Sequence, residues 1–219
     1  MPHSSSGRSA RAFQLPVLKF LTHYPLCGST LLLLIKRNSE ERHVSDIIYK
    51  LTSRNIIVNV IESDEPSGGA SSRSLYELST KSNGFYIFNQ DSQISGSVNE
   101  TMTNLFGYNL WYSVNVTVVG KGGMRLPQAF FPQNKPTVTV NVGISLQNHP
   151  LTTDFHNYEL TLTSPAGARY MSYRGVAAFG NADYASFEMY SAATWDVTLS
   201  YDYALNSTGV IQIRMYLDD

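Results

Sequence analysis

The sequence predicts an α/β unit with parallel strands followed by an all-β unit with antiparallel strands. Two observations lead to this fold class. Residues 29–88 contain short, continuous apolar runs separated by amphipathic segments, whereas residues 108–217 place apolar side chains at every second position. Fourteen tyrosines and ten phenylalanines strengthen the preference for strands, because aromatic side chains pack well on a pleated sheet.

Strand and helix patterns alternate in the first part of the chain. The continuous apolar run 31–35 predicts a strand covered on both faces, and residues 56–61 and 85–88 predict two more. A helix that starts at Asn38 or Ser39 connects the first two strands, and its apolar side is spaced i, i+3, i+4 and i+7: Val44, Ile47, Ile48 and Leu51. A second helix, around Leu75 and Leu78, ends at Asn83-Gly84. Short loops between these elements predict right-handed parallel crossovers.

The hydrophobic period changes close to Gly107. A helix over residues 98–106 is expected to pack back on the parallel sheet, after which about seven alternating strands indicate a β-sandwich. The clearest of these runs are residues 112–118, 138–144, 158–162, 195–201 and 211–217. We therefore predict a disordered N-terminus (1–12), an α/β domain (13–107) and a β-sandwich domain (108–219).

The α/β part resembles the second half of a von Willebrand factor A domain. Four stretches carry the resemblance: the strand Ser29–Ile35, the helix ending at Leu51–Asn55, the strand Ile56–Ile61 and the run from Leu75 to Tyr86. In that family they correspond to the last three strands and their helices. The resemblance implies a partial domain, because the family's first strand, which lies beside the equivalent of residues 31–35, has no counterpart here. We expect residues 11–27 to cover this edge, another copy to pair with it, or the gene product to be truncated.

The family's metal-binding residues are missing from this sequence. Members that bind ligands through a divalent metal use an Asp-x-Ser-x-Ser run and an aspartate in the loop after the equivalent of residues 31–35. Here that loop reads Lys36-Arg37-Asn38-Ser39, and no Asp-x-Ser-x-Ser occurs. We therefore predict no metal-dependent adhesion. We assign no residue to catalysis, to a cofactor or to a metal.

Two weaker features remain as candidates for binding. Asp64 and Glu65 follow the second strand, where open α/β sheets present ligand loops. Either they bind a cation or a basic partner, or they are part of a solvated loop. Gly120–Gly123 lacks the remainder of a phosphate-binding motif and is interpreted as a hairpin turn. Tyrosines of the second part form either an aromatic binding face or part of the core: Tyr170, Tyr173, Tyr184, Tyr190, Tyr201 and Tyr203.

Composition and charge exclude several classes of partner. Sixteen lysines and arginines balance 17 acidic residues, so no net field recruits nucleic acid or anionic lipid. No apolar run reaches the roughly 18 residues of a membrane span. Cys27 is the single cysteine, which rules out an intrachain disulfide. The proline-interrupted N-terminal segment is a poor signal peptide, so either the protein is not secreted or its true N-terminus is missing.

The sequence favours a non-enzymatic interaction or adhesion protein, extracellular or on the cell surface, that binds protein or glycan. Candidate N-glycosylation sites are Asn99, Asn115 and Asn206, although such triplets also arise by chance in a chain rich in Ser and Thr. The domain order also looks like that of nematode secreted or surface proteins, some linked to pathogen response, which implies a role in innate immunity. The alternatives are a truncated paralogue without independent function and an enzyme with an unrecognised site in the sandwich.

Overall fold

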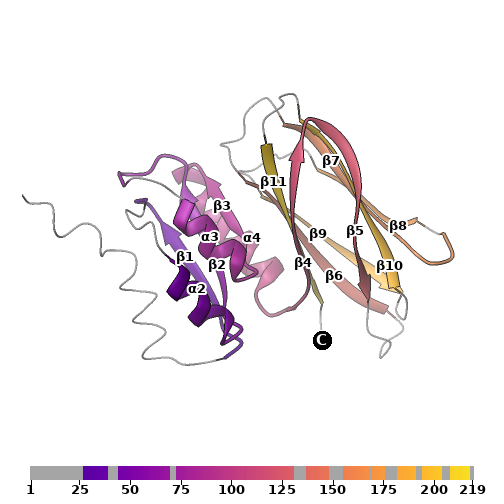
Figure 1. Ribbon diagram of the computed structural model, residues 1–219, viewed down its shortest axis with the longest axis horizontal. Helices are drawn as coiled ribbons and strands as arrows, with labels where there is room; N and C mark the ends of the chain where they lie inside the picture. The colour runs from indigo at the N-terminus through magenta and orange to yellow at the C-terminus, as the bar shows by residue number, and fades with distance from the viewer. Residues whose placement is uncertain are drawn as a thin grey trace, which may run out of the picture. The chain divides into compact units, whose positions relative to one another are not determined.

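The computed structural model describes residues 27–38, 44–69, 73–130, 137–147, 155–167, 169–175, 182–190, 194–203 and 208–217 (Figure 1). The chain forms two compact units, Met1–Ile94 and Ser95–Asp219. The sequence places the change of unit at residue 107, after rather than before the last helix, and that placement stays a prediction.

The first unit contains a parallel sheet with the strand order β1-β2-β3. Its elements are β1 (Thr30–Ile35), α2 (Ser45–Thr52), β2 (Ile57–Ser63), α3 (Arg73–Lys81) and β3 (Tyr86–Asn89). Both strand pairs are parallel, and the two helices share one hydrophobic cluster with the strands. The predicted α/β arrangement of three parallel strands and two helices is confirmed (Figure 1).

Asparagines end both helices of the first unit. Asn55 and Asn83 have φ angles of 53° and 62°, the left-handed conformation that terminates a helix after its last turn. At Gly84 an added Cβ would lie 2.0 Å from the carbonyl oxygen of Val58, so only glycine fits there. The predicted stop at Asn83-Gly84 is confirmed. α2 begins at Ser45, after Val44, so the predicted start at Asn38 is wrong: the N–H of Asn38 donates to the carbonyl oxygen of Gly68 in a loop. The alternative start, Ser39, lies outside the described residues.

β1 is an edge strand of the described sheet. Its partner on one side is β2, and Leu34 is 57% exposed. Residues 11–26, which were expected to cover this edge together with Cys27, lie outside the described part of the chain, and Cys27 itself is exposed. Self-association through residues 31–35 therefore stays a prediction.

The described residues of the second unit form helix α4 and eight strands. They are α4 (Ile94–Leu105, whose first residue belongs to the first unit), β4 (Asn109–Val119), β5 (Lys121–Phe130), β6 (Thr137–Gln147), β7 (Phe155–Thr163), β8 (Arg169–Gly175), β9 (Ala182–Tyr190), β10 (Thr194–Tyr203) and β11 (Thr208–Leu217). Two antiparallel sheets have the orders β5-β10-β7-β8 and β4-β11-β6-β9. Counted from β4 as the first strand, these orders are 2-7-4-5 and 1-8-3-6, the topology of a jelly roll. The predicted sandwich is confirmed, with one more strand than expected.

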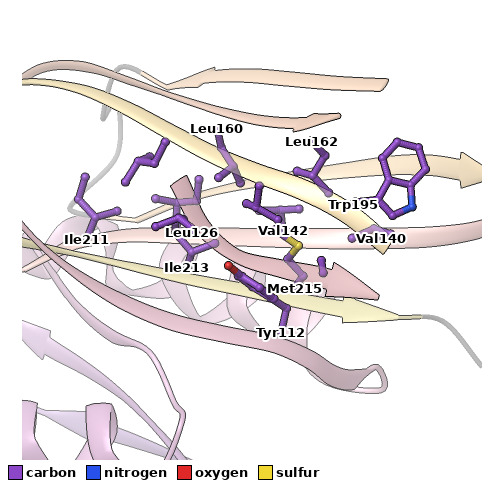
Figure 2. Close-up of a cluster of buried hydrophobic side chains, with 14 of the residues drawn as sticks. Tyr112, Leu126, Val140, Val142, Leu160, Leu162, Trp195, Ile211, Ile213 and Met215 are labelled. Atoms are coloured by element: carbon purple, nitrogen blue, oxygen red, sulfur yellow. The ribbon is translucent and has the colours of Figure 1, made fainter. Parts of the chain in front are cut away.

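The core of the second unit lies between its two sheets. Figure 2 shows side chains of one sheet, such as Leu160 and Leu162, opposite those of the other, such as Ile211 and Met215. Trp195 on β10 is the largest fully buried side chain, with 2% of its surface exposed. Alternation along each strand sends these apolar residues inward, as the period of two predicts.

The sequence interpretation of Gly120–Gly123 as a hairpin turn is only partly right. Gly120 is the turn, with a φ of 58°, but β5 begins at Lys121 and runs through the remaining glycines. At Gly122 an added Cβ would lie 2.7 Å from the hydroxyl of Tyr201 on the neighbouring strand, so the glycine makes room for the tyrosine ring. Pro127 is tolerated because β5 is at the edge of its sheet. Because of these residues, the sequence pattern does not indicate the eighth strand.

The helix expected over residues 98–106 is present as α4, but it belongs to the second unit, where it contacts β9. The hydroxyl groups of Thr101 and of Tyr184 on β9 are hydrogen-bonded at 3.2 Å. This contact differs from the expected packing on the parallel sheet. In the described part of the chain, no helix is long and apolar enough to span a membrane.

Candidate functional site

The three parallel strands end at the same edge of their sheet. β1 is followed by Lys36, β2 ends on Ser63, and Asp91 begins the short 3-10 helix η1 (Asp91–Gln93) just after β3. In open α/β sheets this edge is where ligands bind, because the loops after successive strands converge there. We call it the carboxyl rim and define it as five residues: Lys36, Ser63, Asp64, Glu65 and Asp91.

The ammonium group of Lys36 connects the ends of all three strands. Its Nζ donates hydrogen bonds to Ser63 Oγ at 3.1 Å, to the carbonyl oxygen of Glu65 at 2.9 Å and to the carboxylate of Asp91. Ser63 in turn donates to the second oxygen of the Asp91 carboxylate at 2.6 Å. A lysine ammonium has three hydrogens, so these contacts use its full donor capacity.

The hydrogen bond from Lys36, followed by that from Ser63, lowers the pKa of the Asp91 carboxyl below its ordinary value. Because this pKa is lowered, the stability that the ion pair contributes is fully present above the pKa of Asp91 in the unfolded chain. It is lost as the pH falls through the lower pKa of Asp91 in the folded protein. Both side chains are about half exposed, at 49% and 50%. The pair therefore organises the rim more than it stabilises the fold.

Backbone hydrogen bonds tie the rim loops together. Ser67 N donates to the carbonyl oxygen of Lys36 at 2.8 Å, and Asp64 N donates to that of Asn89 at 3.0 Å. The side chains of Asp64 and Glu65 are exposed and have no hydrogen-bond or ion-pair partner among the described residues. The two carboxylates named from sequence thus lie on a fixed loop with their charges available, while their role in binding stays a prediction.

The rim brings a serine, a lysine and an aspartate together without making a nucleophilic site. Ser63 is 1% exposed, so a substrate has no access to its hydroxyl. The Nζ of Lys36 uses its hydrogens on Ser63, Glu65 and Asp91. Among the described residues, no three His, Cys, Asp or Glu side chains gather as a metal site would require.

A buried carboxyl lies one residue before the rim. Glu62 is 3% exposed and accepts a hydrogen bond from the hydroxyl of Tyr86, which also packs edge-on against Tyr76 and Phe88. Burial raises the pKa of Glu62, and the Tyr86 hydrogen bond opposes part of that increase. The native state therefore holds the Glu62 proton to a higher pH than the unfolded chain does.

This retained proton makes the first unit less stable as pH rises through the raised pKa of Glu62. Glu62→Gln cannot lose a proton, so above that pKa we expect the variant to be more stable than the wild type by on the order of 1 kcal/mol. Below the ordinary carboxyl pKa the two proteins should match. Urea unfolding at a series of pH values measures this, with Glu77→Gln on α3 as a less buried control; parallel pH curves for Glu62→Gln and wild type would show that burial does not matter.

Two of the three glycosylation sequons lie in the described part of the chain. Asn99 on α4 and Asn115 on β4 are both exposed, and Asn206 lies outside the described residues. The Oδ1 atom of Asn115 accepts a hydrogen bond from Arg214 Nη2 at 2.9 Å, which fixes the amide on the edge strand. Solvent exposure is what a glycan at either position requires.

The comparison with protein families gives a match within the second unit. Residues 114–218, slightly less than half of the chain, match a family described as a domain of unknown function (DUF7154). This range coincides with most of the jelly roll. No curated protein matches the sequence.

Solved structures give only remote likenesses. A von Willebrand factor type A protein from Catenulispora acidiphila matches 93% of this chain at 10% identity and a TM-score of 0.33, and the chain spans 43% of that protein. The carbohydrate-binding module CBM36, in complex with calcium and xylotriose, matches 50% of this chain and 92% of its own at 8% identity and a TM-score of 0.27. A module pair of Clostridium thermocellum xylanase 10B matches 52% of this chain and 27% of its own at 11% identity and a TM-score of 0.26.

Proposed function

We propose that this chain is a non-enzymatic extracellular binding protein whose carboxyl rim holds a basic protein segment without a divalent metal. The observation that carries the proposal is the position of the Lys36 ammonium, which contacts Ser63, Asp91 and the Glu65 carbonyl group at once. The rim thus contains its own cation, covalently attached to the chain. A metal ion is not needed to hold these loops in place.

The charges left at the rim define the partner. Asp91 forms an ion pair with Lys36, whereas the carboxylates of Asp64 and Glu65 have no hydrogen-bond or ion-pair partner among the described residues. Exposed carboxylates on a loop fixed by backbone hydrogen bonds lose little conformational entropy on binding. Lysine or arginine side chains of a partner segment are the complementary groups, and rim charges of this kind act mainly on selectivity and association rate.

The extracellular part of the proposal rests on the exposed sequons. Asn99 and Asn115 belong to Asn-x-Thr triplets whose asparagines reach solvent in the folded protein. Attachment of a glycan to either of them leaves the described fold undisturbed. A role in pathogen response, which the nematode resemblance implies, is the finer form of the proposal and depends on identifying the partner.

We expect peptides selected for binding to the intact protein, in buffer that contains EDTA, to be rich in lysine and arginine. The protein is purified from the medium of secreting animal cells, where mass spectrometry should find Asn115 glycosylated. In the double variant Asp64→Asn, Glu65→Gln, the affinity for the selected peptides should fall about 10-fold or more, because each charge-assisted hydrogen bond contributes about 1.5–3 kcal/mol.

The matched control removes an exposed carboxylate elsewhere: Glu188→Gln on β9 should leave the affinity unchanged. Three results would count against the proposal. They are binding that needs a divalent metal, peptides without basic residues, and an Asn115 that stays unmodified together with retention of the protein inside the cell.

A further inference from the structure

The sheet β4-β11-β6-β9 turns one face to the core and carries a polar set of side chains on the other. The ladder pairs Tyr216 with Asn141, Gln212 with Ser145, and Arg214 with Gly143, which in turn pairs with Tyr184. These positions alternate with the core residues of the same strands, so they share the opposite face. We call this set the polar face: Asn141, Ser145, Tyr184, Gln212, Arg214 and Tyr216.

Five of the six residues of the polar face are buried and Tyr184 is half-buried, contrary to what the sequence predicts. Alternating polar residues indicate strands with one solvated face, yet Ser145, Gln212 and Arg214 are all 0% exposed. Helix α4 contributes to the cover, since Thr101, also 0% exposed, is bonded to Tyr184. Burial raises the pKa of the Tyr184 hydroxyl, so the phenol stays protonated.

Two neighbouring groups on this face have no hydrogen-bond partner among the described residues. Asn141 Nδ2 and the Tyr216 hydroxyl are both unpaired, in residues that are 4% and 3% exposed, and the two residues are directly opposite each other on adjacent strands. Unpaired polar groups that are buried reduce stability, and native proteins keep few of them. An adjacent pair of them points to groups retained for a ligand.

We infer that the polar face is a second binding site, for a hydroxyl-rich ligand of the oligosaccharide class, that opens when α4 moves aside. A sugar hydroxyl both donates and accepts, which matches the amide donor of Asn141 and the phenol of Tyr216. The hydrogen bond from Ser145 Oγ to Gln212 Oε1, 2.8 Å long, fixes the orientation of a further amide. Tyrosine rings add an apolar surface for the carbon side of a sugar ring.

The helix that contributes to the cover has a mixed surface. Of the described side chains of α4, only Thr101 and Leu105 are buried, and the helix includes the exposed Gly96. Glycine inside a helix lowers its stability. A ligand that binds only the open form, with α4 away from the sheet, shifts the equilibrium towards that form.

The test is binding of the full chain to an array of neutral and uronate-containing oligosaccharides, followed by calorimetry with the strongest binder. Asn141→Leu and Tyr216→Phe should each raise the melting temperature, since each removes a buried unpaired group, and each should weaken binding about 10-fold. A purely structural role would not combine higher stability with weaker binding. Because these residues are absent from the carboxyl rim, failure here leaves the rim proposal intact, and the reverse also holds.

Variants of α4 test the opening step. In protein made in bacteria, which do not glycosylate the Asn99-x-Thr101 triplet, Thr101→Val removes the bond to Tyr184 and should tighten oligosaccharide binding about 2- to 10-fold, since the closed form loses one hydrogen bond. Thr103→Val, an exposed threonine on the same helix, should change nothing. No array binding by either the wild type or Thr101→Val would overturn the inference. Binding unaffected by both Asn141→Leu and Tyr216→Phe would also overturn it.

Discussion

Replacing Trp195 by alanine should lower the unfolding free energy of the jelly roll by about 3–5 kcal/mol. Trp195 is 2% exposed and is the largest of the fully buried side chains between the two sheets. Truncation to alanine removes its buried apolar surface and leaves a cavity that a close-packed interior fills only in part. Urea unfolding followed by circular dichroism measures the loss from the shift in midpoint.

The second tryptophan supplies the control for this prediction. Trp111 on β4 is 41% exposed, and its indole N–H donates to the carbonyl oxygen of Phe130 at the surface. Trp111→Ala should therefore cost about 1 kcal/mol, the value of one hydrogen bond at a site with little burial. Equal losses for the two variants would contradict the placement of the core between the sheets.

Replacing Lys36 by alanine should give the carboxyl rim an affinity for divalent cations. The substitution removes the ammonium but keeps the three oxygen atoms that it contacts, on Ser63, Glu65 and Asp91. Carboxylate, hydroxyl and carbonyl oxygens are the ligands that hard cations prefer, and water completes such a site. With a single carboxylate, we expect Mn²⁺ to bind with a dissociation constant on the order of 10⁻⁴ to 10⁻³ M.

Calorimetry with Mn²⁺ tests this prediction, and Lys50→Ala on α2 is its control. Lys50 is an exposed lysine of the same unit whose ammonium has no hydrogen-bond or ion-pair partner among the described residues, so its removal should create no cation affinity. A folded Lys36→Ala variant that does not bind Mn²⁺ would show that the ammonium does not fill the place of a metal ion.

The parallel part of the fold follows from sequence because short apolar runs alternate with amphipathic segments, and the asparagines at the helix ends mark where the helices stop. The predicted cover on both faces of residues 31–35 is wrong: β1 is an edge strand whose side chains are half-buried or exposed, with Leu34 57% exposed. β5 was missed because Gly122 and Pro127 are ordinary turn residues. Gly122 leaves room for the Tyr201 ring, and Pro127 is tolerated because β5 is at the edge of its sheet. Both conditions depend on the folded structure.

The sequence predicts only part of the candidate site. Asp64 and Glu65 were predicted because they follow a buried strand, whereas Lys36 appeared only in the loop that lacks the aspartate of the von Willebrand factor A domains that the sequence resembles. Its bond to Asp91, which is 55 positions away in the chain, depends on strands ending at one edge. The polar face was missed because an alternating pattern says which side chains share a face but not whether a helix covers that face.

We propose that the carboxyl rim works with the cation that Lys36 provides, in place of a metal ion. Calorimetric titration of Mg²⁺, Mn²⁺ and Ca²⁺ into the unmodified full chain tests this proposal. We expect heats of dilution alone up to millimolar concentrations, and a melting temperature that EDTA does not change. Saturable binding of one ion per chain that Asp91→Asn abolishes would contradict it.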